Sequence, residues 1–255
     1  MSSSVGLMIV GDEILSGKRH DRHFSAIIDK LRQRGMELAW AHIAGDDEDA
    51  IARVFADARQ RGEVVLSCGG IGATPDDRTR QAAARAYGVP IVRHAQAEAL
   101  ILAEYGEQAV PNRVLMAEFP QGAALIPNPV NRVAGFSIGQ LYCVPGFPEM
   151  AWPMLDWVLD GPLSAMHRSE PPREYRLRAL GARGEGDLLP LMEAVLAAFP
   201  GVKLSSLPSR GDGTRPRHIE FGIRGPQADA AAAFSWFRDQ LARRPDVQIE
   251  DLQSR

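Results

Sequence analysis

Cysteine and long apolar stretches are scarce in this sequence. Its 255 residues include only two cysteines, Cys68 and Cys143, which are too few for a disulfide framework, and no Cys/His pair has the short spacing of a structural zinc site. No segment approaches the roughly 18 consecutive apolar residues of a membrane helix, and the N-terminus lacks the basic and apolar regions of a secretory signal. We therefore expect a cytoplasmic protein without membrane contact, in which both cysteines are buried strand residues.

Lysine is scarce too, and the basic residues do not gather. Only three of the 29 basic residues are lysine, the arginines are scattered among acidic residues, and the formal net charge is −3. Nucleic-acid-binding proteins usually carry a basic patch or stripe, so we expect no nucleic acid as a partner. The remaining composition, 45% apolar and 24% charged, is typical of a globular protein with one large core or two modest ones.

Up to about residue 160, short apolar runs alternate with segments of helical periodicity. This alternation is typical of an α/β fold, in which crossover helices connect the strands of a mostly parallel sheet. Strands are predicted at 5–10, 37–44, 64–68, 136–138 and 141–144, and helices at 24–34, 47–61, 78–87, 96–105 and 148–159.

The remainder predicts a second, smaller domain. Residues 161–172 are rich in Gly, Pro and Ser and lack periodicity, which indicates a linker between a domain at 1–160 and one at 173–255. The order in the second domain is strand, helix, strand, strand, helix, strand, at 174–180, 187–199, 202–207, 218–223, 228–242 and 247–249. That order predicts a small α+β domain, a split βαβ sandwich of the ferredoxin-like kind.

A glycine-rich segment directly follows the predicted strand 64–68. Gly69, Gly70 and Gly72 leave backbone N–H groups uncovered close to a helix start, where they suit a phosphate or another anion. Asp76 and Asp77 follow and would repel a bare phosphate, so a divalent metal such as Mg²⁺ is their expected partner. In the alternative interpretation, Thr74 or Asp76 only caps the helix, Pro75 lies in its first turn, and the glycines form a tight turn.

Acidic residues also follow the first two predicted strands. Asp12 and Glu13 come after the first and Asp46 after the second, whereas Asp47 is predicted to cap the next helix. The carboxyl ends of parallel strands meet at one edge of a sheet. Three acidic strand ends therefore predict a site that collects metal or accepts protons, although an ordinary acidic loop is the simpler alternative.

Two proline-rich loops and a pair of histidines leave alternatives open. The loops at 127–131 and 145–150 are either simple turns or rigid walls for a planar ring such as adenine or pterin. His20 and His23, three residues apart, form either a metal pair or, more simply, part of a solvated helix start.

Four motifs follow one another along the first predicted domain: GDEILSG (11–17), GGIGATPDDRT (69–79), PNPV (127–130) and PGFPEM (145–150). In this order they resemble the motifs of the MoaB/Mog-like molybdopterin-binding domain, and in particular those of the N-terminal region of the CinA (competence/damage-inducible protein A) family. The resemblance spans about residues 5–160, and the smaller domain is similar to the one that follows in CinA proteins. Because this sequence ends at Arg255, we expect a form without the amidase domain that many CinA proteins carry.

The resemblance implies a three-layer α/β domain that binds or adenylates molybdopterin or, in CinA-type proteins, hydrolyses the pyrophosphate of ADP-ribose with a divalent metal. The related domain of some eukaryotic FAD synthases acts on FAD. The alternatives are a molybdopterin-binding protein without catalysis and a regulatory scaffold. A homo-oligomer is also expected. The implied ligand-binding residues are Gly69, Gly70, Ile71, Gly72, Thr74, Asn128, Pro129, Pro145 and Gly146, the metal ligands Glu13, Asp12 and Asp77, and the catalytic residues Asp77, Asp46 and Asp76.

Overall fold

The computed structural model describes residues 4–182, 184–211 and 216–252. They form two compact units that are divided between His167 and Arg168, within the segment 161–172 that the sequence indicates as a linker.

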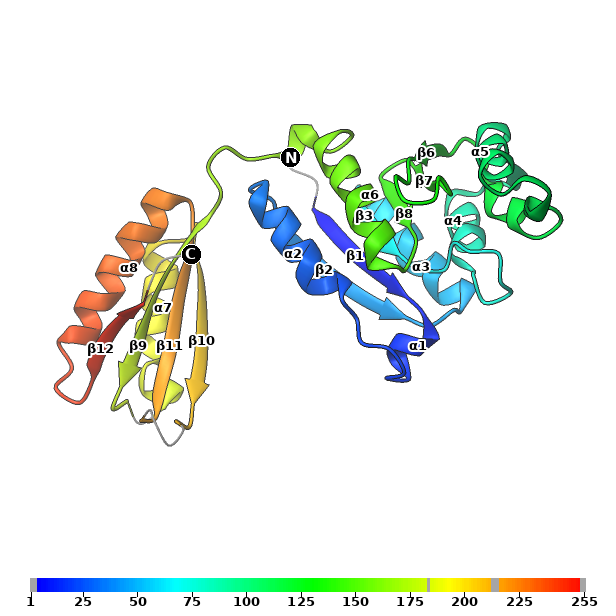
Figure 1. Cartoon of the computed structure of the whole chain (residues 1–255). Coiled ribbons are helices and arrows are strands. Elements are labelled where there is room, and N and C mark those ends of the chain that lie inside the picture. Colours follow the sequence, from blue (N-terminus) through cyan, green and yellow to red (C-terminus); the bar gives the residue numbers. More distant parts are fainter. Residues whose placement is uncertain (1–3, 183, 212–215, 253–255) are drawn as a thin grey trace. The chain divides into compact units, whose positions relative to one another are not determined.

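A six-stranded sheet forms the centre of the first unit (Figure 1). Its four strands β2, β1, β3 and β8 are parallel, and β7 and β6 continue the sheet in antiparallel pairing. The predicted mostly parallel α/β sheet is thereby confirmed. In sheet order the strands are β2 (Leu38–Ala44), β1 (Val5–Val10), β3 (Val64–Cys68), β8 (Leu141–Val144), β7 (Gly135–Ile138) and β6 (Ala124–Ile126).

Helices cover both faces of this sheet, which makes three layers (Figure 1). Along β1, Met8 packs in one apolar cluster with α3, α4 and α5, and its neighbours Leu7 and Ile9 pack in a second cluster with α2 and α6. Because successive strand residues point to opposite faces, a strand buried on both sides must be apolar throughout. The helices are α1 (Asp12–Leu15), α2 (His23–Gln33), α3 (Glu48–Gln60), α4 (Thr79–Tyr87), α5 (Ala95–Tyr105) and α6 (Pro148–Asp160).

The sequence analysis missed the shortest elements. Besides α1 and β6, these are the two-stranded sheet of β4 (Ile91–Arg93) and β5 (Glu118–Pro120) and the 3₁₀ turns η1 (Gly106–Ala109), η2 (Arg113–Ala117) and η3 (Ser164–Met166). An element of three to five residues cannot establish a hydrophobic period by itself, so short elements are predicted only where a compact apolar run stands out, as at 64–68 and 141–144.

The second unit has the predicted ferredoxin-like order. Its antiparallel sheet runs β10-β11-β9-β12, and its core includes Leu177, Phe221 and Phe237. The elements are β9 (Arg173–Leu180), the 3₁₀ turn η4 (Glu185–Asp187), α7 (Leu189–Ala198), β10 (Lys203–Ser209), β11 (His218–Gly225), α8 (Gln227–Ala242) and β12 (Gln248–Leu252).

Two expectations from composition can be compared with the fold. Cys68 and Cys143 are free and fully buried in the neighbouring strands β3 and β8, as expected. Within the described ranges, no helix has the length and apolar character needed to cross a membrane.

Candidate functional site

The glycine-rich segment follows β3, and its backbone conformation and close contacts leave no room for side chains at Gly69 and Gly70. Gly69 and Gly70 have positive φ angles of 103° and 68°, which L-residues rarely adopt. A Cβ on Gly69 would lie 2.2 Å from the carbonyl oxygen of Val10, and one on Gly70 would lie 2.3 Å from the hydroxyl of Thr79. Thr79 donates from this hydroxyl to the Gly69 carbonyl at 2.9 Å and from its backbone N–H to the Gly70 carbonyl at 2.9 Å. The first residue of α4 thus fixes the loop.

The prediction that the backbone N–H of Gly69 binds phosphate is wrong. The Gly69 N–H donates to the carbonyl of Val144 at 3.0 Å, where it continues the pairing of β3 with β8. A backbone N–H has one hydrogen to give, so the candidates that remain for a phosphate are the N–H groups of Gly70 and Gly72.

The capping interpretation is also wrong, because neither Thr74 nor Asp76 caps α4. Helix α4 begins at Thr79 after the N-cap residue Arg78, which makes no side-chain cap. Instead, the Asp77 carboxylate accepts from the Thr74 backbone N–H at 2.9 Å and from the Thr74 hydroxyl. Asp77 therefore closes the loop on itself, and the same carboxylate oxygen would lie 2.5 Å from a Cβ on Gly72.

A buried arginine that the sequence analysis missed holds the other side of this loop. Arg80 is 4% exposed, and its guanidinium donates to the carbonyls of Gly72, Leu115 and Glu118. Burial lowers the pKa of Arg80, against the opposing charges of Asp77 and Glu118. The available signal was its spacing, since Arg80 lies three and four residues before the buried Ala83 and Ala84 of α4.

The acidic residues at the ends of β1 and β2 meet as predicted. The Asp12 N–H donates to the Asp46 carboxylate at 3.0 Å, and the Asp46 N–H donates to the Asp12 carboxylate at 3.2 Å. Burial and the neighbouring charges of Asp12, Asp76 and Glu13 raise the pKa of Asp46, which the hydrogen bond from Asp12 partly offsets. Asp47 caps α3 by accepting from the Ala50 N–H at 2.8 Å, as predicted.

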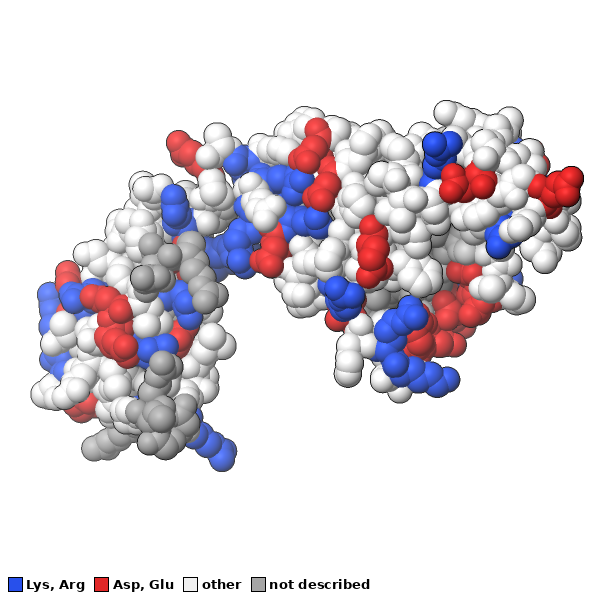
Figure 2. All heavy atoms as spheres, viewed as in Figure 1, with Lys and Arg blue, Asp and Glu red and all other residues white. Residues whose placement is uncertain are grey.

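A hollow beside this pair is lined by four carboxylates, those of Asp12, Glu13, Asp46 and Asp76, together with Lys18. Figure 2 shows acidic side chains gathered near the part of the first unit where α1 lies, with basic side chains beside them. Of the two aspartates predicted in the glycine-rich segment, Asp76 lines the hollow that Asp12 lines, and Asp77 does not.

In the described part of the chain, no three His, Cys, Asp or Glu side chains are grouped so that they could hold a metal by themselves. Mg²⁺ usually takes one or two protein carboxylates and completes its shell with phosphate oxygens and water. The carboxylates of this hollow are of the ligand type that Mg²⁺ prefers, and such an ion would depend on phosphate or water for its remaining ligands.

A cavity of about 490 Å³ joins the glycine loop to the acidic residues. This volume is in the range of pockets for small molecules, about 300–1,000 Å³. Asp12 and Pro129 of the predicted residues are absent from its lining. The predicted residues that line it are Glu13, Asp46, Gly69, Gly70, Ile71, Gly72, Thr74, Asp76, Asp77, Asn128, Pro145 and Gly146.

The apolar side of the cavity comes mainly from residues that the sequence analysis did not select. Tyr105 lies at the end of α5, inside the helix predicted at 96–105, and Met116 lies in η2, which was not predicted. Phe147 and Met150 belong to the predicted loop at 145–150 but were not assigned a role. Aromatic and methionine side chains offer a surface on which a planar ring can stack.

The loop at 128–133 is a rigid wall of this cavity. The buried amide of Asn128 donates to the Asn131 side chain at 2.8 Å and to the Val133 carbonyl at 3.0 Å, and accepts from the Val130 N–H at 3.0 Å. These bonds hold Arg132 at a φ of 59°, the one positive φ of a non-glycine residue in the described ranges. Asn128 therefore shapes the wall and lines the cavity together with Asn131 and Val133.

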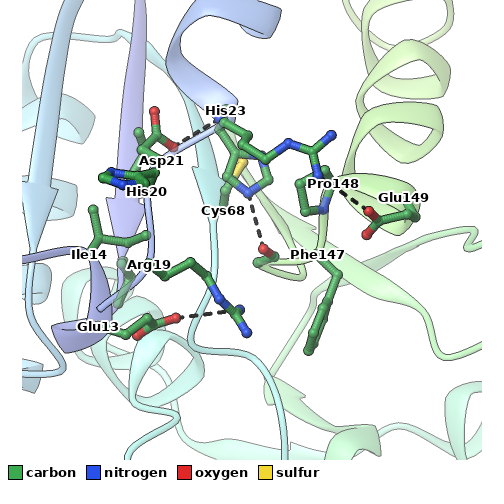
Figure 3. A pocket seen from close by; sticks show the side chains of 14 residues that line it. Glu13, Ile14, Arg19, His20, Asp21, His23, Cys68, Phe147, Pro148 and Glu149 are labelled. Atoms are coloured by element: carbon green, nitrogen blue, oxygen red, sulfur yellow. Dashed lines mark hydrogen bonds and ion pairs between the residues drawn. The ribbon is translucent and has the colours of Figure 1, made fainter. Parts of the chain in front are cut away.

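A second, smaller hollow of about 280 Å³ lies beside the first (Figure 3). His23 lines it at the start of α2 and is 5% exposed, so the prediction of a solvated helix start is wrong for this residue. Its Nε2 lies 3.2 Å from the carbonyl oxygen of Gly146. The side chain of Asp21 takes the capping role, accepting from the N–H groups of His23 and Phe24.

Comparison with known proteins places the first unit in a described family. The sequence model of the family described as "Probable molybdopterin binding domain" matches residues 6–165. The crystal structure of a CinA protein of unknown function from Thermoplasma acidophilum has 28% sequence identity and a TM-score of 0.57, and the match covers 62% of this chain and 98% of that one.

Curated relatives extend the similarity to the second unit. A CinA-like protein of Anaeromyxobacter dehalogenans is 28% identical over 242 residues, which cover 90% of this chain and 57% of that protein. A protein of Pyrobaculum aerophilum is 29% identical over 253 residues, which cover 94% of each chain. The chain thus spans little more than half the length of the CinA-like relative.

Proposed function

We propose that this chain, which belongs to the probable molybdopterin-binding domain family and is CinA-like, is an enzyme that hydrolyses the pyrophosphate of a nucleotide of the ADP-ribose or FAD type with the help of a divalent metal. Support comes from one observation above all. A single cavity combines a glycine loop suited to phosphate, a set of carboxylates and an apolar wall. A nucleotide pyrophosphate has the matching three parts, namely phosphates, the metal that they bind, and a planar base.

Different residues of this cavity would bind the phosphates, contact the base and accept a proton. The N–H groups of Gly70 and Gly72 bind phosphate oxygens, and Tyr105 and Met116 contact the base. The raised pKa of Asp46 suits it to accept the proton of the attacking water. The water oxygen bonds to one phosphorus, the bridging P–O bond breaks, and ADP-ribose yields AMP and ribose 5-phosphate.

Asp12, with Glu13 and Asp76 close by, would hold the metal, which would neutralise charge on the pyrophosphate oxygens. Asp77 takes a positioning role in this proposal, because its carboxylate is bonded to Thr74. This division replaces the expectation that Asp77 is itself a metal ligand.

The test is a hydrolysis screen of the purified protein with ADP-ribose, FAD, NAD and coenzyme A. Each substrate is incubated with Mg²⁺, with Mn²⁺ or with a chelator, and released AMP is measured. We expect metal-dependent release from ADP-ribose or FAD, and a loss of at least about 100-fold in Asp46→Asn, the range in which a general base contributes. Asp57→Asn, an exposed α3 residue paired with Arg61, is the matched control and should retain full activity.

Absence of AMP release from every substrate in the presence of metal, with the protein folded, would refute this function. Equal activity in Asp46→Asn and the wild type would refute the assignment of the base while leaving the reaction in place.

A second candidate function is binding of a molybdopterin without cleavage. The specific observation in its favour is that Tyr105, Met116 and Met150 face the same cavity as the glycine loop, an arrangement equally suited to a pterin ring with a phosphate. Protein purified from cells that make the cofactor should then release a fluorescent pterin on denaturation, and Gly70→Ala should reduce the amount released.

A further inference from the structure

The cavity of about 490 Å³ carries an excess of negative charge. Four of its lining residues are acidic, namely Glu13, Asp46, Asp76 and Asp77, whereas Arg19 is the one basic residue of its lining within the described ranges. A pyrophosphate adds further negative charge, and like charges repel more strongly in a partly closed cavity than in water. Charge balance therefore singles out Arg19 among the side chains that could contact a bound phosphate.

The contacts of Arg19 place it across the end of β3. In the sheet, β3 lies between β1 and β8, and the glycine loop follows β3. Arg19 belongs to the segment after β1, where its backbone N–H donates to the Glu13 carbonyl at 3.0 Å. Its guanidinium carbon lies 5.8 Å from the centre of the ring of Phe147, which follows β8 (Figure 3). The guanidinium thus lies where the segments on either side of β3 meet, and it lines the same cavity as Gly70 and Gly72.

The guanidinium of Arg19 is held weakly in this position. The Arg19 side chain is 57% exposed, and its nitrogen lies 3.8 Å from the Glu13 carboxylate, which is beyond hydrogen-bond distance. The contact with the Phe147 ring is not a hydrogen bond either. A guanidinium presents five N–H donors in a planar fork that matches two phosphate oxygens. A phosphate can therefore replace Glu13 as the partner of Arg19 without the loss of a hydrogen bond.

The other basic side chains in this region have different positions or partners. Lys18 lines the hollow of four carboxylates but not the cavity. Arg22 lines the smaller hollow but not the cavity, and it pairs with Glu149 at 3.6 Å. The guanidinium of Arg80 donates to three backbone carbonyls. Arg19 is thus the described basic side chain best placed to reach a ligand.

We infer that Arg19 is a phosphate-binding residue of this site, whose guanidinium leaves Glu13 and binds oxygens of the substrate's pyrophosphate. The inference rests on the proposed function and adds to it a positively charged side chain beside the N–H groups of Gly70 and Gly72. The exchange also releases the Glu13 carboxylate from its ion pair at the moment when the substrate is bound.

The test measures binding and needs no turnover. Isothermal titration calorimetry determines the affinity of the full chain for ADP-ribose, with Ca²⁺ in place of Mg²⁺ to slow hydrolysis. Arg19→Met removes the charge and the N–H donors but keeps a long side chain beside Phe147. We expect it to bind ADP-ribose about tenfold more weakly than the wild type, the lower end of what hydrogen bonds to a charged group contribute. Arg19→Gln, which keeps a polar side chain, should show the same loss.

A matched variant and a matched ligand separate phosphate binding from an effect on the cavity wall. Arg22 is 60% exposed and also lies in an ion pair with a glutamate, so Arg22→Met should bind ADP-ribose as the wild type does. Adenosine carries no phosphate, and its affinity for Arg19→Met, measured by NMR titration, should stay within about twofold of the wild-type value. An equal loss for adenosine and ADP-ribose would overturn the inference, because Arg19 would then only shape the wall.

Equal ADP-ribose affinities of Arg19→Met and the wild type would also overturn the phosphate contact, while metal-dependent AMP release by both proteins would leave the proposed hydrolysis intact. Absence of ADP-ribose binding and of hydrolysis in the wild type would overturn the proposed function, and the role of Arg19 with it.

Discussion

Two glycines with nearly the same φ angle allow the energetic cost of crowding in the glycine loop to be measured. Gly70 and Gly62 have φ angles of 68° and 67°. A Cβ on Gly70 would lie 2.3 Å from the Thr79 hydroxyl, whereas one on Gly62 would have no atom within 4 Å. Replacing each by alanine therefore introduces the same backbone strain, but only Gly70→Ala adds a collision at the site.

The expected loss of unfolding free energy has two contributions, the backbone strain and the collision at the site. An alanine in the left-handed region costs roughly 1–2 kcal/mol, which is the whole expected effect of Gly62→Ala. Overpacking adds about 1–3 kcal/mol, so Gly70→Ala should lose about 2–5 kcal/mol of the free energy of unfolding. In a unit of this size the difference corresponds to about 2–12 °C in the unfolding temperature, at roughly 2–4 °C per kcal/mol.

The assay is thermal and urea unfolding of both variants, followed by circular dichroism and by tryptophan fluorescence. The unit that begins at Arg168 carries neither substitution, so its transition serves as an internal reference. Equal losses of stability in the two variants would refute the reasoning, because the close approach of Thr79 would then have no energetic consequence. Ligand affinity should fall only in Gly70→Ala.

Two further predictions concern charged groups near the same site. Arg80→Met should lower the free energy of unfolding by about 3–5 kcal/mol, because it leaves buried carbonyls without their charged donor. The control is Arg85→Met, which should change this free energy little, because the exposed pair of Arg85 with Asp49 is worth at most about 1 kcal/mol. Equal losses of the two variants in urea unfolding would contradict the role of Arg80. Asp46→Asn should stabilise the protein slightly at neutral pH, because the raised pKa of Asp46 means that its ionised form destabilises the fold above that pKa. This advantage over the wild type should shrink as the pH falls through the raised pKa and the native carboxyl becomes protonated, and a constant difference from pH 4 to 8 in urea titrations would count against it.

Several parts of the site could be predicted because they depend on local chain properties. The glycines after a buried strand were predicted to leave the backbone uncovered or to form a tight turn, and Gly69 and Gly70 have positive φ angles and no room for a Cβ. Acidic residues after parallel strands were expected to meet at one sheet edge, as Asp12 and Asp46 do. Long strands and helices were predicted within a few residues because their hydrophobic period extends over several turns or pleats.

Other parts depend on which segments the fold brings together. The sequence gives no indication that Arg80 would reach the carbonyls of Leu115 and Glu118, or that the Gly69 N–H would be used by Val144. His23 and Gly146 are 123 positions apart, and only the packing of α2 beside the end of β8 makes them neighbours.

The order of the longer elements, the two-unit organisation and the presence of a glycine loop with carboxylates could be inferred from the sequence, because hydrophobic period and backbone freedom are properties of consecutive residues. Folding settles which Asp joins the acidic hollow, that the Gly69 N–H is used by Val144, and that the buried His23 lines a second hollow. Those outcomes depend on hydrogen bonds and contacts between distant segments, which form only when the chain is folded.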